Sequence, residues 1–536
     1  MDKTHARSRG MNTSQWKVLG SVATLLLLGT VACTDPTVAP KSTITGANYF
    51  NDPNSYVQFL AKIYGGLALS GQSGPDGQPD IRGIDEGFSQ YLRLYWEHQE
   101  LPSDEAVIGW NDIGLPEMNL QTWTSSSTMV VAMYYRIFFQ VGMANEFLRQ
   151  TTDAALAGRP GITPALKTQI QQYRAEARFL RALSYWHGID LFGNIPLVIE
   201  TDALGATPPK QSTRGAIYTF IVSELTAIAS QLPAPSAATY GRATGSAAQM
   251  LLAEVYLNAG VYTGTPHWAE ALTAAQAVIS SGSYSIDTSY RHLFLADNNT
   301  SPEMIFPIPQ DGMKTQTWGG VTFLTHAACG GNMSNTTYGI DGCWWGLRLK
   351  PEAYNFYATG DKRTGFFYTT NQTVAVTNIG DFHSGIAAPK FQNVTLAGAP
   401  GSNTTFVDTD FPVFRLAEAF LIYAEAVLQG GGGTRAQALV YVDSLRRRAY
   451  GGTSGDITDP QLTLDFILAE RGRELLWEAH RRTDLVRFGR FTGGTYLWAW
   501  KGGTLAGAAT DPHLNLYPFP ASELIANPNL TQNPGY

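Results

Sequence analysis

The chain has few of the residues that carry metal or covalent chemistry. It holds three cysteines and nine histidines in 536 residues, and no two histidines show HxxH or HExxH spacing. The Gly-x-Ser-x-Gly turn of serine hydrolases is also absent. We therefore expect no metal site, no cofactor and no nucleophile-based enzyme. Acidic loops such as residues 80–85 could hold a structural Ca²⁺, although solvated carboxylates are commoner in such loops.

Charge is sparse as well. Charged residues make up 15% of the chain, and the net charge is −7 at pH 7. Nucleic-acid binders need a basic surface, so this class is excluded. Hydrophobic residues reach 44% and aromatic residues 12%, including 12 Trp and 25 Tyr. The composition predicts a globular protein with aromatic-rich loops.

Long hydrophobic runs are also rare, and the clearest stands near the N-terminus at 18–32. It follows several basic residues and is shorter than the roughly 20 residues that a membrane helix needs. This pattern predicts a signal peptide at 1–32. Met11 could replace Met1 as the start, because it would give a tidier basic segment.

Cys33 directly follows the run and sits in a lipobox-like context, although Thr30 stands where Leu is usual. We predict lipidation of Cys33 and a polar tether over 33–45. An ordinary cleaved signal with an incidental cysteine is the alternative. The other two cysteines, Cys329 and Cys343, would then lie in an exported protein, where disulfides persist. We predict that they pair, with a gain of roughly 3 kcal/mol.

Helical periodicity dominates the first half of the mature chain. The predicted helices are 52–69, 88–97, 127–150, 163–191 and 213–232. Two further pairs of Ala-rich helices resemble each other: 244–260 with 267–281, and 411–429 with 434–449. Such pairs resemble tetratricopeptide repeats. An irregular helical bundle is the alternative.

A last long helix is predicted at Ile467–Phe491, with three glutamates in one line at i, i+4 and i+8. Like charges at this spacing destabilise an exposed helix. We therefore expect Glu470, Glu474 and Glu478 to be partly buried and paired with arginines such as Arg415 and Arg446. A catalytic acid–base role is the weaker alternative, because nothing nearby suggests a nucleophile.

Residues 284–406 form a long block without helical periodicity, and two pieces, 303–307 and 373–377, read as strands. The block is too long for a simple connection. We interpret it as a second lobe or a set of functional loops.

Several segments together resemble the SusD/RagB family of outer-membrane nutrient-binding lipoproteins. They occur in the family's order and span nearly the whole mature chain: the Cys33 region, 179–198, 281–308, 415–427, 467–491 and 517–536.

The resemblance implies a mainly α fold of four right-handed, tetratricopeptide-like helix pairs, with long irregular loops and short strands forming a ligand face. It implies one domain over 46–536. The helical scaffold would cover about 46–65, 127–282 and 411–491, and the loop-rich part about 66–126, 283–410 and 492–536.

It also implies a surface-facing lipoprotein of the outer membrane that binds a glycan, or less often a peptide, without catalysis. The partner would be a TonB-dependent outer-membrane channel of the SusC type. An exported glycoside hydrolase is the rival, and would need two carboxylates roughly 5–10 Å apart across a sugar.

Trp and Tyr faces cover the flat C–H faces of sugars, and polar side chains bind the hydroxyls. Three loop clusters combine such residues. The first contains Trp318, Asn332, Tyr338, Asp341, Trp344 and Trp345. The second contains Asp104, Glu105, Trp110, Asn111, Asp112 and Trp123, and the third Tyr496, Trp498 and Trp500.

Core packing is the alternative for each loop tryptophan, and we expect Trp186, Trp268 and Trp477 in the core. The preferred ligand residues are Trp110, Trp318, Trp344, Trp345, Tyr338, Asp104, Asn111 and Asp341.

Overall fold

The computed structural model describes residues 46, 48–205 and 207–536. The predicted signal peptide, Cys33 and the tether lie outside the described residues. The chain divides into a short unit up to Phe50 and a large unit, Asn51–Tyr536. Among the described residues, no helix combines the length and apolar character that crossing a membrane requires.

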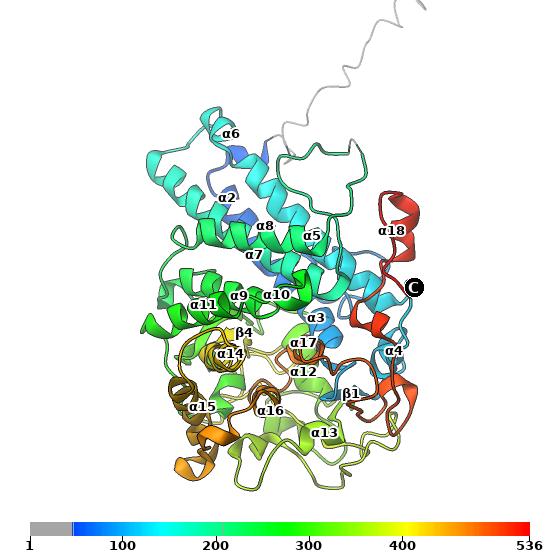
Figure 1. Cartoon of the computed structure of the whole chain (residues 1–536). Coiled ribbons are helices and arrows are strands. Elements are labelled where there is room, and N and C mark those ends of the chain that lie inside the picture. Colours follow the sequence, from blue (N-terminus) through cyan, green and yellow to red (C-terminus); the bar gives the residue numbers. More distant parts are fainter. Residues whose placement is uncertain (1–45, 47, 206) are drawn as a thin grey trace, which may run out of the picture. The chain divides into compact units, whose positions relative to one another are not determined.

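The large unit is mainly helical (Figure 1). Its long helices are α2 Ser55–Ala68, α3 Tyr91–Glu100, α5 Thr128–Gln150, α7 Pro164–Phe192, α8 Arg214–Ile228, α9 Gly245–Leu257, α11 Trp268–Ser280, α12 Gly320–Ala327, α14 Leu416–Leu428, α15 Arg435–Tyr450 and α16 Leu464–Glu474. The shorter ones are α4 Leu115–Leu120, α6 Asp153–Ala157, α10 Ala259–Thr263, α13 Pro351–Tyr354, α17 Arg481–Arg487 and α18 Ala521–Ala526.

Threonine hydroxyls fix where many of these helices begin. A threonine side chain caps α7, α8, α9, α15 and α16 by accepting a hydrogen bond from the third residue of the helix. Such caps satisfy amide groups that have no partner within the helix. The starts therefore lie within a residue or two of most predicted ones.

The helices pack in the order of the chain. Helix α5 packs on α7, α7 on α8, α9 on α11, and α11 on α14, which also contacts α15 and α16. Figure 1 shows α7 with α8, α9 with α11, and α14 with α15 as successive rows. Buried alanines at these contacts, such as Ala248, Ala275 and Ala424, allow the close approach.

Two small antiparallel sheets bring distant loops together. Strand β1, Ala106–Ile108, pairs with β3, Leu347–Leu349, and β2, Met304–Ile308, pairs with β4, Phe411–Arg415. The predicted strand at 303–307 is thus β2. The one predicted at 373–377 makes only an isolated bridge from Thr373 to Ser384.

Two helix predictions are wrong. The segment predicted as a helix from Phe411 begins as β4, and its helix, α14, starts only at Leu416. Pairing with β2, more than 100 residues earlier, holds these apolar residues extended. The helix predicted at 244–260 is in fact two helices, because α9 ends at Leu257 and α10 begins at Ala259.

The predicted single helix at 467–491 is also wrong. Helix α16 ends at Glu474 and α17 begins at Arg481, and between them Trp477 and Ala479 have φ of 61° and 64°. Side chains from far along the chain hold this break. Trp96 Nε1 donates to the Trp477 carbonyl at 3.0 Å, and the Trp477 amide donates to Glu105 at 3.1 Å.

Candidate functional site

Pairing of β1 with β3 brings the loop after β1 against the segment before β3. The Gly109 amide donates to the Gly346 carbonyl at 3.0 Å. One residue further out, Trp110 Nε1 donates to the Trp344 carbonyl at 3.0 Å. The first two predicted clusters therefore meet, although more than 200 residues separate them.

Three tryptophans form one aromatic surface at this point. Trp344 lies between the other two, with its ring centroid 6.3 Å from that of Trp110 and 6.1 Å from that of Trp318. All three side chains are half-buried, so each is partly accessible. We call Trp110, Trp318 and Trp344 the tryptophan platform.

The platform rests on a second set of rings that sequence reasoning missed. Phe323 of α12 lies 5.7 Å from Trp110, and Phe406 lies 4.9 Å from Trp318. The Arg93 guanidinium lies 4.1 Å from the Phe323 ring centroid. Arg93 lies on α3, a helix that the sequence predicted, and Phe323 lies on the short helix α12. The sequence pattern alone could not show that either residue faces this surface.

A disulfide and a histidine hold Trp344 in place. Cys329 and Cys343 are disulfide-bonded, with Cα atoms 4.7 Å apart. The Trp344 amide donates to the His326 carbonyl at 2.9 Å, and the Trp345 amide to the Cys329 carbonyl at 2.9 Å. The His326 ring stacks on Trp344, with centroids 4.5 Å apart.

The loops that carry the platform also carry exposed polar side chains. Asn111, Asp112, Asn332 and Asp341 are exposed, and the Asp341 carboxylate accepts a hydrogen bond from the Thr405 hydroxyl. Carboxylates and amides at the edge of exposed rings can bind ligand hydroxyls while the rings cover apolar faces. This arrangement suits binding of a ligand with both kinds of surface.

Trp345 belongs to a different surface. Its side chain is 49% exposed, and its backbone has a φ of 58°. Its ring centroid lies 5.9 Å from that of Phe382 and 6.3 Å from that of His383. Within the described part of the chain, its ring contacts are with these two side chains and not with the platform, although it follows Trp344 directly.

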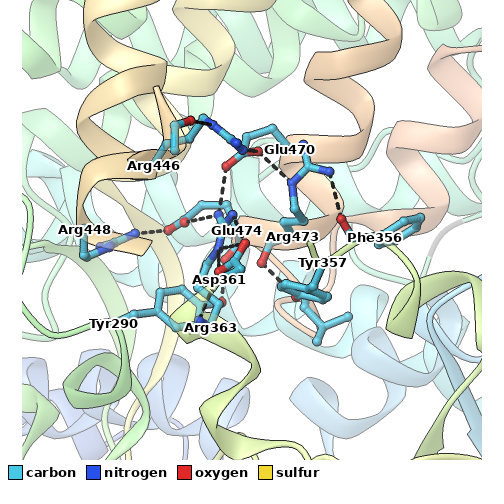
Figure 2. Close-up of polar contacts among 12 residues, drawn as sticks. Tyr290, Phe356, Tyr357, Asp361, Arg363, Arg446, Arg448, Glu470, Arg473 and Glu474 are labelled. Atoms are coloured by element: carbon cyan, nitrogen blue, oxygen red, sulfur yellow. Dashed lines mark hydrogen bonds and ion pairs between the residues drawn. The ribbon is translucent and has the colours of Figure 1, made fainter. Parts of the chain in front are cut away.

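Glu470 and Glu474 of the predicted line lie in a buried ion-pair network (Figure 2). Glu470 lies 2.8 Å from Arg363 and 2.9 Å from Arg446, and Glu474 lies 2.7 Å from Arg415 and close to Arg448. Because α16 ends at Glu474, the third glutamate is not on this helix.

Glu478 nevertheless lies 2.6 Å from Arg415 and 2.7 Å from Lys390, so the network continues past the helix end. Burial alone would raise the pKa of Glu470, but Arg363 and the other arginines outweigh it and lower the pKa to about 2. The network joins α16 to α15, β4 and the short 3-10 helix Lys362–Phe366, and it binds the scaffold together.

Among the described residues, Glu254, Glu418 and His480 bring possible metal-ligand atoms within 4.8 Å of one another. Arg471 lies 3.7 Å from Glu254, and its positive charge disfavours a cation there. Burial, followed by the charge of Glu254, raises the pKa of Glu418 well above its usual value. The raised pKa favours the protonated form of Glu418 beside Glu254, and Arg471 adds positive charge to this group.

Comparison with known proteins identifies the family. Residues 355–536 match the SusD family, and residues 103–257 match a family described as starch-binding and associating with the outer membrane. The starch-binding protein SusD of Bacteroides thetaiotaomicron is 34% identical over 98% of this chain and 100% of its own length. The chain belongs to the SusD family.

Other SusD-family proteins agree with this. SusD-like protein P2 of Formosa agariphila is 25% identical over 78% of this chain and 83% of its own. A SusD superfamily structure from Bacteroides vulgatus has a TM-score of 0.70 at 19% identity, covering 90% and 99% of the two chains. The surface glycan-binding protein A of Bacteroides thetaiotaomicron, solved with laminarihexaose, has a TM-score of 0.68 at 21% identity, covering 89% and 98%. These structures establish the SusD fold for this chain.

Two of the preferred ligand residues are buried in this SusD-family chain. Asp104 is fully buried, and both of its carboxylate oxygens lie 2.7 Å from the Arg481 guanidinium. Although burial opposes it, Arg481 lowers the pKa of Asp104. Tyr338 is only 8% exposed. This burial disfavours the predicted contact of these two side chains with a ligand.

Other residues of the predicted clusters also pack within the SusD-like scaffold. Trp123 and Trp498 are buried, as is Glu105, and Trp500 Nε1 donates to the Val376 carbonyl at 2.7 Å. Tyr496 donates its hydroxyl to Asp104. Of the three residues expected in the core, Trp186 and Trp477 are buried and Trp268 is half-buried.

Proposed function

We propose that this chain captures an oligosaccharide or polysaccharide at the cell surface and delivers it to a TonB-dependent outer-membrane channel. The tryptophan platform carries this proposal, because it offers three neighbouring, partly accessible indole rings at a loop-built surface. The names of the relatives, a starch-binding protein and a surface glycan-binding protein bound to laminarihexaose, support the same ligand class.

The physical reason lies in the shape of sugars. A pyranose ring has apolar C–H faces and a rim of hydroxyls, so it stacks on an indole and donates to polar groups beside it. Several adjacent rings can cover successive sugars of one chain. Because indoles lose little conformational entropy on binding, a preformed platform is well suited to weak, repetitive ligands.

We propose binding without catalysis. Asp104 is buried against Arg481, and the line of glutamates is fully paired with arginines and lysine, so none of them is free to act on a sugar. A protein that only holds the glycan needs a partner to move it, and the channel is that partner in the proposal.

Lipidation at Cys33 would place the protein on the outer membrane facing outward. The hydrophobic run before Cys33 and the polar stretch after it support this anchor.

The test is a glycan array beside a peptide panel, followed by isothermal titration of the best ligand. Trp344→Ala should lower glycan affinity by about tenfold, since it removes the central ring. The control is Trp268→Ala, a half-buried tryptophan of α11, which should leave affinity unchanged. Binding of peptides alone would overturn the glycan proposal, and release of shorter sugars from any bound glycan would favour a hydrolase.

A further inference from the structure

A hollow of about 710 Å³ opens at Asp311, on the loop that leads to Trp318 of the platform. Its lining includes Tyr240, Gln310, Asp311, Asp408 and Asp410. The volume lies within the range of small-ligand sites. We call it the acidic hollow.

Two loops connect the hollow to the tryptophan platform. Residues 311–318 begin at Asp311 in the hollow and end at Trp318, and residues 402–408 pass Phe406 before reaching Asp408. The loops lie side by side, because the Gly312 amide donates to Asp408 at 2.7 Å. At their other end, the Trp318 and Phe406 rings are 4.9 Å apart. These two loops therefore link the hollow to the platform.

One buried donor in the hollow has no partner in the described structure. The Gln310 side chain belongs to a residue that is only 7% exposed, and its Nε2 makes no hydrogen bond there. A buried amide without an acceptor costs free energy. A ligand hydroxyl could accept from this group.

The acceptors of the hollow are fixed in position but keep free lone pairs. The Asp410 carboxylate accepts from the Tyr240 hydroxyl at 2.5 Å and from the backbone amide of Gln310 at 2.7 Å. Asp408 accepts from Gly312 and from Ser402. A carboxylate offers about four acceptor positions, so both aspartates can still accept from ligand hydroxyls.

The charge of the hollow selects among glycans. Three aspartates line it, and Lys314, paired with Asp311 at 2.9 Å, is the cation beside them. Uronic acids and sulfated sugars would meet net negative charge there, whereas neutral sugars would meet only hydrogen-bonding groups.

We propose that the acidic hollow is a second contact region for the glycan, so that platform and hollow form one extended site for a neutral chain long enough to reach both. This rests on the proposed function. Short oligosaccharides occupy the platform alone, and longer ones gain the contacts of Gln310, Tyr240 and the two aspartates.

The experiment is isothermal titration with a short and a long oligosaccharide of one neutral glycan. Maltotriose and maltoheptaose are the first pair, and the array supplies the pair if the preferred glycan differs. Gln310→Ala and Tyr240→Phe should each lower affinity for the long chain by about fivefold and leave the short chain unchanged. Trp344→Ala should weaken both, and Gln276→Ala on α11, a matched glutamine outside the hollow, should weaken neither.

The outcomes separate the two proposals. If Trp344→Ala weakens binding but both hollow variants bind long and short chains like the wild type, the hollow is not part of the site and the proposed function stands. If no glycan binds, both proposals fail, whereas binding of charged glycans alone would overturn the proposal for the hollow and leave the proposed function standing. Tighter binding of long oligogalacturonate than of the long neutral chain would overturn the selection by charge. Equal melting temperatures for all variants would show that lost affinity is not lost folding.

Discussion

The Trp344 indole lies almost parallel to the His326 imidazole, with ring centroids 4.5 Å and planes 24° apart. The two ring nitrogens of His326 face carbonyls on different loops, that of Gly342 at 2.7 Å and that of Thr405 at 3.0 Å. One buried side chain thus supports the central ring of the platform and ties together the two loops that border it.

The first prediction concerns this histidine. His326→Phe should keep the stacked ring but lose the contacts to Gly342 and Thr405, so glycan affinity should fall about fivefold. His326→Gln, which can still donate to one carbonyl, should lose less. Isothermal titration measures both, with the melting temperature as the control for folding. Wild-type affinity in His326→Phe would show that stacking alone positions Trp344.

The second prediction tests the break between α16 and α17. Ala479 has φ of 64°, a conformation that costs an L-residue about 1 kcal/mol and costs glycine nothing. Ala479→Gly should therefore raise the free energy of unfolding by up to about 1 kcal/mol in urea titration. In a continuous helix the same change would lower it by about that amount, so the sign of the effect distinguishes the two structures.

This break shows what the sequence could and could not predict. Periodic apolar residues are a local signal, and they were enough to predict α5, α7, α11 and α15, of which α7 and α15 also begin at a threonine cap. The break depends instead on Trp96 and Glu105, whose side chains bond to the Trp477 backbone from more than 370 positions away. No pattern within 467–491 contains that information.

The candidate site divides in the same way. Composition indicated which loops carry partly accessible rings, because Trp110, Trp318 and Trp344 stand among polar residues. Which of the many loop tryptophans meet depends on the pairing of β1 with β3, a contact between distant segments. Asp104 also stands among polar residues in the sequence, yet it forms an ion pair with Arg481 in the core.

The third prediction concerns the buried network. Glu474→Ala leaves Arg363, Arg415 and Arg448 without a common partner, so it should lower the free energy of unfolding by about 3–5 kcal/mol. Arg435→Ala is the matched control, because its ion pair with Asp459 is exposed and should cost less than about 1 kcal/mol. Equal melting temperatures for Glu474→Ala and the wild type would contradict the network's structural role.

The fourth prediction follows from the low pKa of Glu470. Its pKa is about 2 in the folded protein and about 4.3 in an unfolded chain. Between these two pKa values the unfolded chain therefore binds more protons than the folded protein. The contribution of Glu470 to the free energy of unfolding is present above pH 4.3 and is lost as the pH falls toward 2. Urea unfolding at pH 7, 4 and 3 should show that the free energy of unfolding declines steeply with falling pH. In Glu470→Gln this free energy should be lower at pH 7 and should decline less. An unchanged slope in that variant would assign the acid sensitivity to other carboxylates.

The last prediction concerns two carboxyls that hold the break from the other side. Glu105 accepts from the Trp477 amide at 3.1 Å and Glu100 from the His480 amide at 3.2 Å. Burial raises the pKa of Glu100 to about 7, and burial together with the charge of Glu100 raises the pKa of Glu105 well above its usual value. Both values lie above the unfolded one, so the folded protein binds more protons from about pH 4.3 upward, and these groups make it less stable as the pH rises to 7.

Glu105→Gln replaces the protonated carboxyl by a neutral amide that can donate to Glu100 and still accept from Trp477. It should raise the free energy of unfolding at pH 8 by about 2 kcal/mol and have less effect at pH 5. Glu146→Gln, at a half-buried surface pair with Arg149, is the matched control and should change neither value by more than about 0.5 kcal/mol. If Glu105→Gln is destabilising at pH 8, Glu105 is ionised in the folded protein and its contact with Arg481, at 3.5 Å, outweighs the repulsion from Glu100.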